Sequence, residues 1–321
     1  MMKKMKGWQF TKTNQPLVLV EKEIPQAPKG EVVIRTGACG ICHSDVGVLR
    51  DEGWLSMMKL PVIMGHEAAG TIIEVGEGVK GFKVGDRVAV CPTGPSGKGA
   101  PGYVYDGGFG THLVADARDL VPVPEQLTMA EAAAATDAGM TSYHAIFAVG
   151  GAKPGMKVAL IGIGGLGQFG LQALIAAGVE EVFAVDISPA ARELAEKIGA
   201  KRVVTNIKEL ADEKLDLIVD FAGFGVTTTE ALETVKPGGT VVLVGMGRLE
   251  FKVNVADFIV NAKRILASVG GTKEDIAAVY KLMASGKLKP QLHEITFEQI
   301  PQGILELEQN KVQGRLVAVF K

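Results

Sequence analysis

Residues 158–186 read VALIGIGGLGQFGLQALIAAGVEEVFAVD, and this stretch decides the fold. Short apolar runs at its two ends enclose three glycines and a longer apolar segment, so the pattern predicts strand, glycine turn, helix and strand. Gly162, Gly164 and Gly167 have the spacing of a dinucleotide-binding turn, in which backbone N–H groups approach a pyrophosphate at a helix N-terminus. The alternative is a glycine-rich turn inside the core.

The rest of this motif supports a nucleotide site. Gly165 and Leu166 complete the turn and are expected to contact the cofactor with the three glycines. Asp186 ends the second strand, where a carboxylate hydrogen-bonds the adenosine ribose and repels a 2′-phosphate, which favours NAD over NADP. Residues 158–179 carry no charge, but their glycines and glutamines argue against a helix in a bilayer.

Strands and helices continue to alternate beyond Asp186, which predicts a doubly wound parallel sheet with its ligand at the carboxyl ends of the strands. Gly245 follows one predicted strand, in KPGGTVVLVG, and is a further candidate for contact with the cofactor. A simple turn is the alternative at that position.

Composition limits the classes of function. A chain of 321 residues is long enough for two domains, and a net charge of −2 with a pI near 6.3 attracts neither nucleic acid nor an anionic membrane. Small molecules are the expected partners. Three cysteines are too few for a disulfide framework, and the start MMKKMKGWQF lacks the apolar segment of a signal peptide, so we expect a cytoplasmic location.

The first 120 residues alternate short β-rich runs with glycine and proline, which is typical of an all-β unit. Within it, ACGICHSD at 38–45 and GHE at 65–67 supply a thiolate, Cys42, and an imidazole, His66, that are suited to zinc. The CxxC of Cys39 and Cys42 alone is compatible with a redox pair, and no second CxxC completes a four-cysteine site. Burial of Cys42 and His66 in the core is the simpler alternative.

Asp137 is the candidate third ligand. It follows an alanine-rich helix that begins at a capping box formed by Thr128 and Glu131. A buried carboxylate there needs a partner, and one thiolate, one carboxylate and one imidazole balance Zn²⁺ while leaving its fourth position open, as in a catalytic site. The alternative is that Asp137 caps the helix that follows.

Together, GICHSD, GHE, TDAGMTSYHA, GIGGLG with its Asp, and the final GRLVAVF resemble the medium-chain zinc-dependent alcohol dehydrogenase family, in the branch that includes secondary-alcohol dehydrogenases. The resemblance spans almost the whole chain. It implies a mainly β, GroES-like catalytic domain at 1–148 and 291–321, a Rossmann NAD-binding domain at 149–290, and an active site in the cleft between them. It also implies a homodimer or homotetramer, paired through the predicted strand 265–269.

The same resemblance implies roles for single residues. Cys42, His66 and Asp137 would hold one catalytic zinc, with Glu67 beside it as an alternative ligand or supporting carboxylate. Zinc acts as a Lewis acid on a bound alcohol, so that hydride can pass to the nicotinamide.

Three more residues are assigned around this centre. Ser44 would take the alcohol proton and pass it to the cofactor ribose, His43 would lie near the pyrophosphate, and Trp54 would line the substrate pocket. A helix N-cap is the alternative for Ser44, and ordinary packing is the alternative for Trp54.

Two departures from the family pattern stand out. The loop after residue 90 reads CPTGPSGKGAPGYVYDGGFG, with Cys91 in place of the four cysteines of a structural zinc lobe, so one zinc per chain is expected. This glycine- and proline-rich loop should be mobile unless its neighbours order it. Gly47 stands where some members carry a histidine that completes the proton relay.

The resulting hypothesis is a zinc-dependent, NAD-linked dehydrogenase that interconverts a primary or secondary alcohol with its aldehyde or ketone. A zinc-free quinone or enone reductase of the same superfamily is the rival enzyme. A dinucleotide-binding protein without turnover is the rival from another class.

Overall fold

A computed structural model describes residues 4–321, and the chain forms two compact units. The first unit contains 1–137, 272–284 and 292–321, and the second contains 138–271 and 285–291. Among the described residues, no helix is both long enough and apolar enough to cross a membrane.

The second unit is built on a six-stranded parallel sheet in the order β11-β10-β9-β12-β13-β14. This is the order of a Rossmann fold, so the predicted doubly wound sheet is confirmed. Its strands are β9 Lys157–Ile161, β10 Glu181–Val185, β11 Arg202–Val204, β12 Leu217–Asp220, β13 Thr240–Leu243 and β14 Arg264–Ala267.

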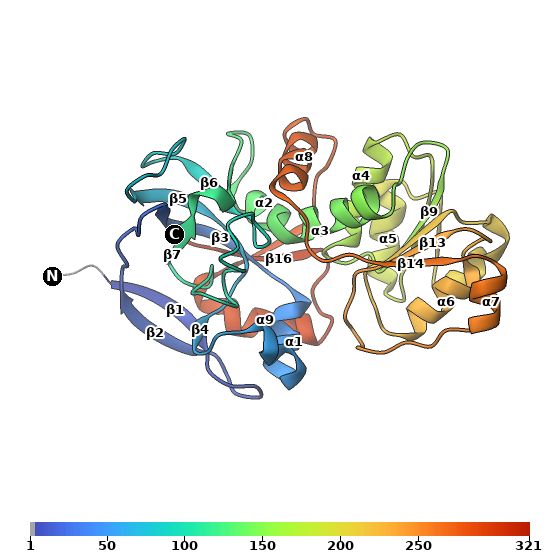
Figure 1. Ribbon diagram of the computed structural model, residues 1–321, viewed down its shortest axis with the longest axis horizontal. Helices are drawn as coiled ribbons and strands as arrows, with labels where there is room; N and C mark the ends of the chain where they lie inside the picture. Colours follow the sequence, from blue (N-terminus) through green and yellow to red (C-terminus); the bar gives the residue numbers. More distant parts are fainter. Residues whose placement is uncertain (1–3) are drawn as a thin grey trace. The chain divides into compact units, whose positions relative to one another are not determined.

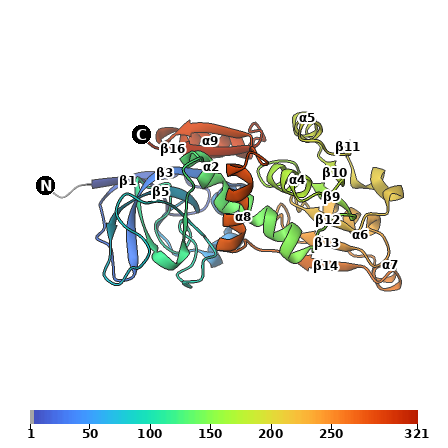
Figure 2. The ribbon, with the colours of Figure 1, turned by 90° about the horizontal axis from the view of Figure 1, so that it is seen from above.

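Helices cover both faces of this sheet (Figure 2). Along β9, Val158 and Leu160 point into one core while Ala159 and Ile161 point into the other, because side chains alternate across a strand. Both faces are therefore dry, which explains the continuous apolar runs in the sequence. The helices are α3 Met140–Tyr143, α4 Gly167–Ala176, α5 Pro189–Ile198, α6 Val226–Thr234 and α7 Val255–Val260.

The first unit is mainly β (Figure 1). Its larger sheet is centred on β3 Glu31–Ile41. The first half of β3 pairs with β7 His112–Asp116, and the second half pairs with β16 Arg315–Val319. Register shifts near Val33 and Thr36 bend β3 between these two partners. The other strands of this sheet are β5 Glu67–Val75, β6 Arg87–Val90, β7 His112–Asp116, β8 Leu120–Pro122, β15 Leu292–Thr296 and β16 Arg315–Val319.

A three-stranded sheet and four α-helices complete the described part of the first unit. Its strands are β1 Lys4–Phe10, β2 Val18–Glu23 and β4 Val62–Ile63, and its helices are α1 His43–Arg50, α2 Met129–Ala134, α8 Lys273–Ala284 and α9 Ile300–Glu308. The predicted capping box begins α2: Thr128 Oγ accepts from the Glu131 backbone N–H at 3.1 Å, and Glu131 accepts from the Thr128 N–H at 2.8 Å. The α2 helix lies against β3, β5 and β16 and continues into a π-helical turn, Ala135–Gly139.

Candidate functional site: a Cys/His/carboxylate cluster and a glycine turn

Four side chains of the first unit converge on one point. The ligand atoms of Cys42, His66, Glu67 and Asp137 all lie within 4.8 Å of one another. Cys42 lies between the end of β3 and the start of α1, His66 and Glu67 lie at the start of β5, and Asp137 lies in the π-helical turn after α2. Residues 42 and 137 are 95 positions apart in the chain. The packing of α2 on the sheet of β3 and β5 brings them together.

Local hydrogen bonds fix the approach of Cys42. Its backbone N–H donates to Asp45 Oδ2 at 2.8 Å, and the first turn of α1 therefore begins at His43, with Cys42 as its N-cap. Ser44 lies inside the first turn, so the alternative that it caps the helix is wrong. Asp137 lies within the π-helical turn, and Gly139 is the residue that precedes α3, so the cap alternative for Asp137 is wrong as well.

The imidazole of His66 is held between carboxylates. Its Nε2 lies 3.7 Å from a carboxylate oxygen of Glu67 and 3.7 Å from one of Asp137, and its Nδ1 lies 3.5 Å from Asp45 Oδ1. Burial lowers the pKa of His66, but the neighbouring carboxylates outweigh burial and raise the pKa well above its usual value. The site therefore stabilises a cation at its centre.

The positions of two buried polar atoms indicate whether the cluster fits a metal. His66 Nδ1 and Asp45 Oδ1 face each other without a good hydrogen bond, since 3.5 Å is too long. A cation on Nε2 fixes the tautomer in which Nδ1 carries the proton, and gives Asp45 a proton to accept. The donor set of thiolate, imidazole and carboxylate is the one that zinc prefers, so the residues fit zinc.

Arg315, on β16, enters the same cluster. Its guanidinium donates two hydrogen bonds to Glu67, one of them 3.0 Å long, and one to Asp137 Oδ2 at 3.1 Å. The pKa of Glu67 is raised to about 7. Burial is the main cause, the charge of Asp137 adds to it, and the charge of Arg315 opposes it by lowering the pKa. The sequence carried one signal for this residue, an arginine at the start of an apolar strand, GRLVAVF.

The remaining predicted residues of the first unit lie around this cluster. His43 is exposed on the first turn of α1, and Ser44 is half-buried next to it. Tyr103, which no sequence pattern had singled out, packs its ring edge to face against His66, with the ring centroids 5.5 Å apart.

Trp54 explains the glycine at position 47. The indole of Trp54 covers Gly47 so closely that a Cβ there would lie 2.8–3.0 Å from ring atoms. Real Cβ atoms essentially never come under 3.0 Å, so the chain has no room for a side chain at 47. Trp54 is half-buried in the short helix Glu52–Met57 and packs against the core cluster that includes Val48 and Ile63.

The glycine turn of the second unit has the geometry the sequence predicts. Gly162 has a φ of +88°, and a Cβ on Gly167 would lie 2.0 Å from the carbonyl oxygen of Gly162, so both positions require glycine. Gly164 is different, because no atom lies within 4 Å of where its Cβ would be. The protein itself does not need a glycine at 164, whereas the approach of a pyrophosphate to the backbone does. Gly165 and Leu166 lead from this open position into α4.

Asp186 links the glycine turn to the end of β10. One carboxylate oxygen accepts from the Ile163 N–H at 2.7 Å and the other from the Ser188 N–H at 2.8 Å. Gly245 is packed against the turn that follows β12, and a Cβ there would lie 2.5 Å from the Phe221 carbonyl oxygen. Close backbone packing thus requires glycine at 245, and contact of this residue with the cofactor stays a prediction.

The loop that follows Cys91 is ordered by its neighbours. Asp119 accepts hydrogen bonds from Ser96, one of them from the backbone N–H at 2.8 Å. Asp106 accepts from the Ile63 N–H at 2.9 Å and pairs with Lys22 at 2.7 Å. Carboxylates therefore hold this loop in place.

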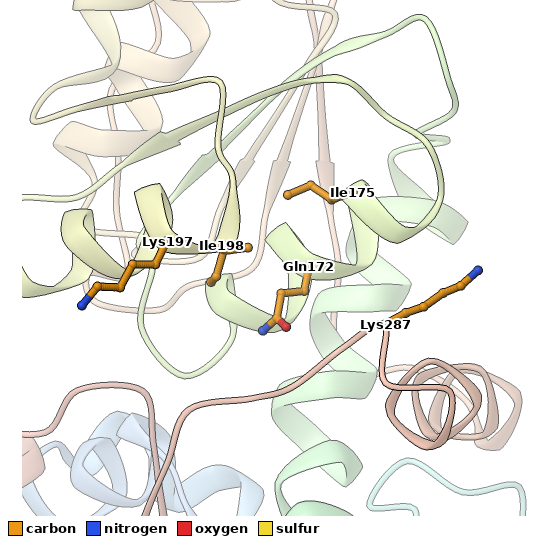
Figure 3. A pocket seen from close by; sticks show the side chains of 5 residues that line it. All are labelled: Gln172, Ile175, Lys197, Ile198 and Lys287. Atoms are coloured by element: carbon orange, nitrogen blue, oxygen red, sulfur yellow. The ribbon is translucent and has the colours of Figure 1, made fainter.

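A surface pocket of about 270 Å³ lies in the second unit, and none of its lining residues belongs to the glycine turn. Figure 3 shows its lysines, Lys197 and Lys287, pointing away from each other. Lys197 pairs with Glu193 at 2.7 Å, and both ends of the Gln172 amide are hydrogen-bonded to backbone groups. No set of polar groups converges on this pocket.

Comparisons with known proteins agree with this fold. Residues 28–125 match the alcohol dehydrogenase GroES-like domain, and residues 165–285 match the zinc-binding dehydrogenase domain. An alcohol dehydrogenase of Geobacillus stearothermophilus is 33% identical over 348 residues, which cover 99% of each chain. The chain therefore belongs to the medium-chain zinc-dependent alcohol dehydrogenase family.

Solved structures show the same architecture over the whole chain. The acetophenone reductase of Geotrichum candidum, solved in complex with NAD, superposes with a TM-score of 0.91 at 30% identity, covering 98% of this chain and 97% of its own. The 2R,3R-butanediol dehydrogenase of Bacillus subtilis superposes with a TM-score of 0.86 at 26% identity, covering 98% and 99%. The predicted two-domain fold class is confirmed.

Proposed function

We propose that this protein is an NAD-dependent zinc alcohol dehydrogenase that interconverts a secondary or primary alcohol with its ketone or aldehyde. The observation that carries the proposal is the cluster of Cys42, His66, Glu67 and Asp137, whose ligand atoms lie within 4.8 Å of one another. This cluster disfavours a zinc-free reductase, because a reductase without metal has no use for four ligating groups gathered at one point, two of them buried.

In this proposal Cys42, His66 and Asp137 hold one zinc per chain. Glu67 is the less suitable ligand, because Arg315 already binds both of its oxygens. Zinc acts as a Lewis acid that makes a bound hydroxyl more acidic or a bound carbonyl more electrophilic. Asp45 orients the His66 ring from behind, which is how supporting carboxylates hold ligating histidines.

The chain's own groups handle the proton. Ser44 lies two residues after Cys42, and its hydroxyl can accept a proton from the substrate while it donates its own. We propose that it passes that proton to the cofactor ribose, with His43, exposed on the same turn, near the pyrophosphate. Trp54 lines the substrate pocket, and with no side chain at Gly47 the last acceptor is water or His43.

The second unit supplies the cofactor site. We propose that NAD places its pyrophosphate on the turn from Gly162 to Gly167, where open space at Gly164 supports a close approach. Asp186 receives the adenosine ribose and excludes a 2′-phosphate. Functionally, we assign residues 149–290 to NAD binding and residues 1–148 with 291–321 to catalysis.

Secondary alcohols are the favoured substrate class. The relatives named for acetophenone and for 2R,3R-butanediol act on a ketone and on a secondary diol, and both superpose over the full chain. A small alcohol or carbonyl is therefore the proposed partner. We propose a cytoplasmic enzyme, because the described cysteines, Cys39, Cys42 and Cys91, form no disulfide.

We also propose a homodimer or homotetramer. The edge strand β14 pairs with β13 on one side only, and Leu266, Val269 and Val260 are 40%, 87% and 82% exposed there. An edge strand with apolar neighbours is suited to pairing with a second copy. Light scattering of the purified protein tests this; a monomer at micromolar concentration would contradict it.

The experiment that tests the function is metal content, NADH binding and alcohol oxidation in the wild-type protein and in Asp137→Ala. We expect one zinc per wild-type chain and turnover of a secondary alcohol such as 2-butanol. Asp137→Ala should lose zinc and activity while it retains NADH binding, because the glycine turn lies in the other unit. Retained zinc and activity in this variant would refute the ligand assignment, and a zinc-free active wild type would refute the zinc mechanism.

A further inference from the structure

Two glutamines of α4 hold a segment that connects two parts of the first unit. Residues 285–291 belong to the second unit, although α8 before them and β15 after them belong to the first. The side-chain amide of Gln168 donates to the Gln291 carbonyl at 3.0 Å and accepts from the Gln291 N–H at 2.6 Å. Gln172 makes the same pair of bonds with Lys289, at 3.2 Å and 2.7 Å. The segment is therefore bound to α4 through both glutamines.

The spacing of the two glutamines matches the spacing of the backbone groups that they bind. Residues four apart in a helix share one face and are separated by roughly 6 Å along the axis. Alternate residues of an extended chain point the same way and are roughly 6.7 Å apart. Pro290 lies between the two bound residues and has no N–H that needs a partner. Residues 289–291 thus bind the glutamines as an extended strand binds its neighbour.

Gln168 joins this segment to the glycine turn. It directly follows Gly167, and its backbone N–H donates to the carbonyl of Gly164, the open position of the turn, at 3.3 Å. Gln168 is fully buried, so its amide cannot exchange Gln291 for water without a large cost. Because two hydrogen bonds join the same two groups, they fix the orientation of Gln291 as well as its distance.

The other side of Gln291 leads to the metal cluster. The next residue, Leu292, begins β15, which pairs in parallel with β16. In that pairing Leu292 is the partner of Arg315, which donates hydrogen bonds to two carboxylates of the metal cluster. One peptide bond therefore separates the residue that the glutamine amide holds from the strand pair that contains Arg315.

We propose that Gln168 is a positioning residue, which links the turn that receives the pyrophosphate to β15 and β16, so that a bound dinucleotide orders these two strands. This role rests on the proposed function. Hydride passes from an alcohol at the metal cluster to a cofactor at the glycine turn, and a misplacement of about 1 Å can lower such a rate about 100-fold. Gln168 acts through the backbone of Gln291 and exchanges no proton.

Three variants separate this role from simple stabilisation. Gln168→Met keeps the length of the side chain and removes both hydrogen bonds to Gln291. Gln172→Met is the matched control, one turn further along α4, because it removes the same kind of contact and leaves Gln291 bound. A glycine inserted between Gln291 and Leu292 keeps the hydrogen bonds of Gln168 but lengthens the link to β15. This insertion decides the matter if Gln168→Met does not fold.

Hydrogen–deuterium exchange with and without saturating NADH measures the link without turnover. β15 is an edge strand, which is suited to local opening and hence to measurable exchange. In the wild type we expect NADH to slow exchange about threefold or more, both in residues 162–170 and in β15 and β16. In Gln168→Met and in the insertion variant, NADH should protect residues 162–170 alone. Gln172→Met should respond as the wild type does.

Kinetics with 2-butanol and with its 2-deuterated form give the second readout. Gln168→Met should retain zinc and bind NADH with a Kd within about threefold of the wild-type value, while kcat falls about fivefold or more. The lowered kcat should show a primary isotope effect, because the slowed step is hydride transfer. Gln172→Met should keep the wild-type kcat.

The outcomes that contradict the role are distinct from those that contradict the proposed function. A wild type that oxidises alcohol but shows no effect of NADH on β15 and β16 would overturn the role alone. So would an undiminished effect of NADH in Gln168→Met or in the insertion variant, an equal loss in Gln172→Met, or a lowered kcat without an isotope effect. Loss of zinc in Gln168→Met would also overturn it, since the defect would then lie in the metal site. A wild type that binds no NADH or oxidises no alcohol removes the proposed function, and this role with it.

Discussion

Replacing Arg315 by leucine should destabilise the metal-free protein in a way that depends on pH. Glu67 is fully buried, and both of its oxygens accept hydrogen bonds from Arg315. In the metal-free protein the pKa of Glu67 is about 7, raised by burial and by Asp137 and lowered by Arg315. Arg315→Leu removes the largest influence that favours the carboxylate and leaves only the weaker charge of His66 on that side.

The size of the effect follows from proton linkage. Because the pKa of Glu67 is higher in the folded state than in the unfolded state, stability falls as pH rises from the ordinary value of 4.5 to about 7, and is level above that in the wild type. Without Arg315 the folded state keeps the proton to higher pH, so its stability continues to fall by about 1.4 kcal/mol per pH unit. From pH 7 to pH 9 the gap between variant and wild type should widen by about 3 kcal/mol.

Urea unfolding in a chelating buffer at several pH values measures this gap. Both tryptophans, Trp8 and Trp54, lie in the first unit, so their fluorescence reports on the unit that contains Arg315. The control is Arg315→Leu combined with Glu67→Gln, which has no proton to retain and should show a gap to the wild type that does not vary between pH 7 and pH 9. A constant gap in the single variant between pH 6 and pH 9 would refute the reasoning.

Three further predictions concern other parts of the chain. Asp186→Ala should lower the preference for NAD over NADP about tenfold, because it removes the charge that repels a 2′-phosphate; kcat/KM with each cofactor tests this, and an unchanged ratio would mean that another group sets the preference. Gly47→Ala should cost about 1–3 kcal/mol of stability and shift the tryptophan emission, because its Cβ collides with Trp54; wild-type stability and emission would show that the ring moves freely. Asp119→Ala should expose the loop around Ser96 to limited proteolysis, since it loses the acceptor of two hydrogen bonds; unchanged cleavage rates would contradict this.

The nucleotide-binding fold could be predicted because its signals are local. Residues 158–186 contain two apolar strands, the glycines and the helix in one short piece of sequence, and both faces of the sheet are buried. The strand β1 was not predicted, although Met5 and Gly7 alternate with exposed Lys4 and Lys6 as in a strand. Because of its lysines, this segment has the composition of a charged terminus and not that of a strand.

Some residues of the metal cluster belong to short sequence motifs, whereas others are brought to the cluster only by the fold. Cys42, His66 and Asp137 stand in recognisable motifs, so they could be listed from the sequence. Arg315 is 248 residues from Glu67, and nothing local to either position indicates that they pair. Tyr103 lies in a loop whose path depends on contacts with Gly65, and that path is set by packing.

The position of Arg315 has a consequence for biosynthesis. The first unit is assembled from three separate stretches, and β16 inserts between β15 and β3. A ribosome that makes this chain releases Cys42, His66 and Asp137 long before Arg315, so the nascent sheet carries Glu67 with no guanidinium to neutralise it. The second unit needs little beyond residue 271 and can fold earlier. Closure of the metal cluster is thus among the last events of synthesis, and a chain truncated before β16 is a natural substrate for chaperones and proteases.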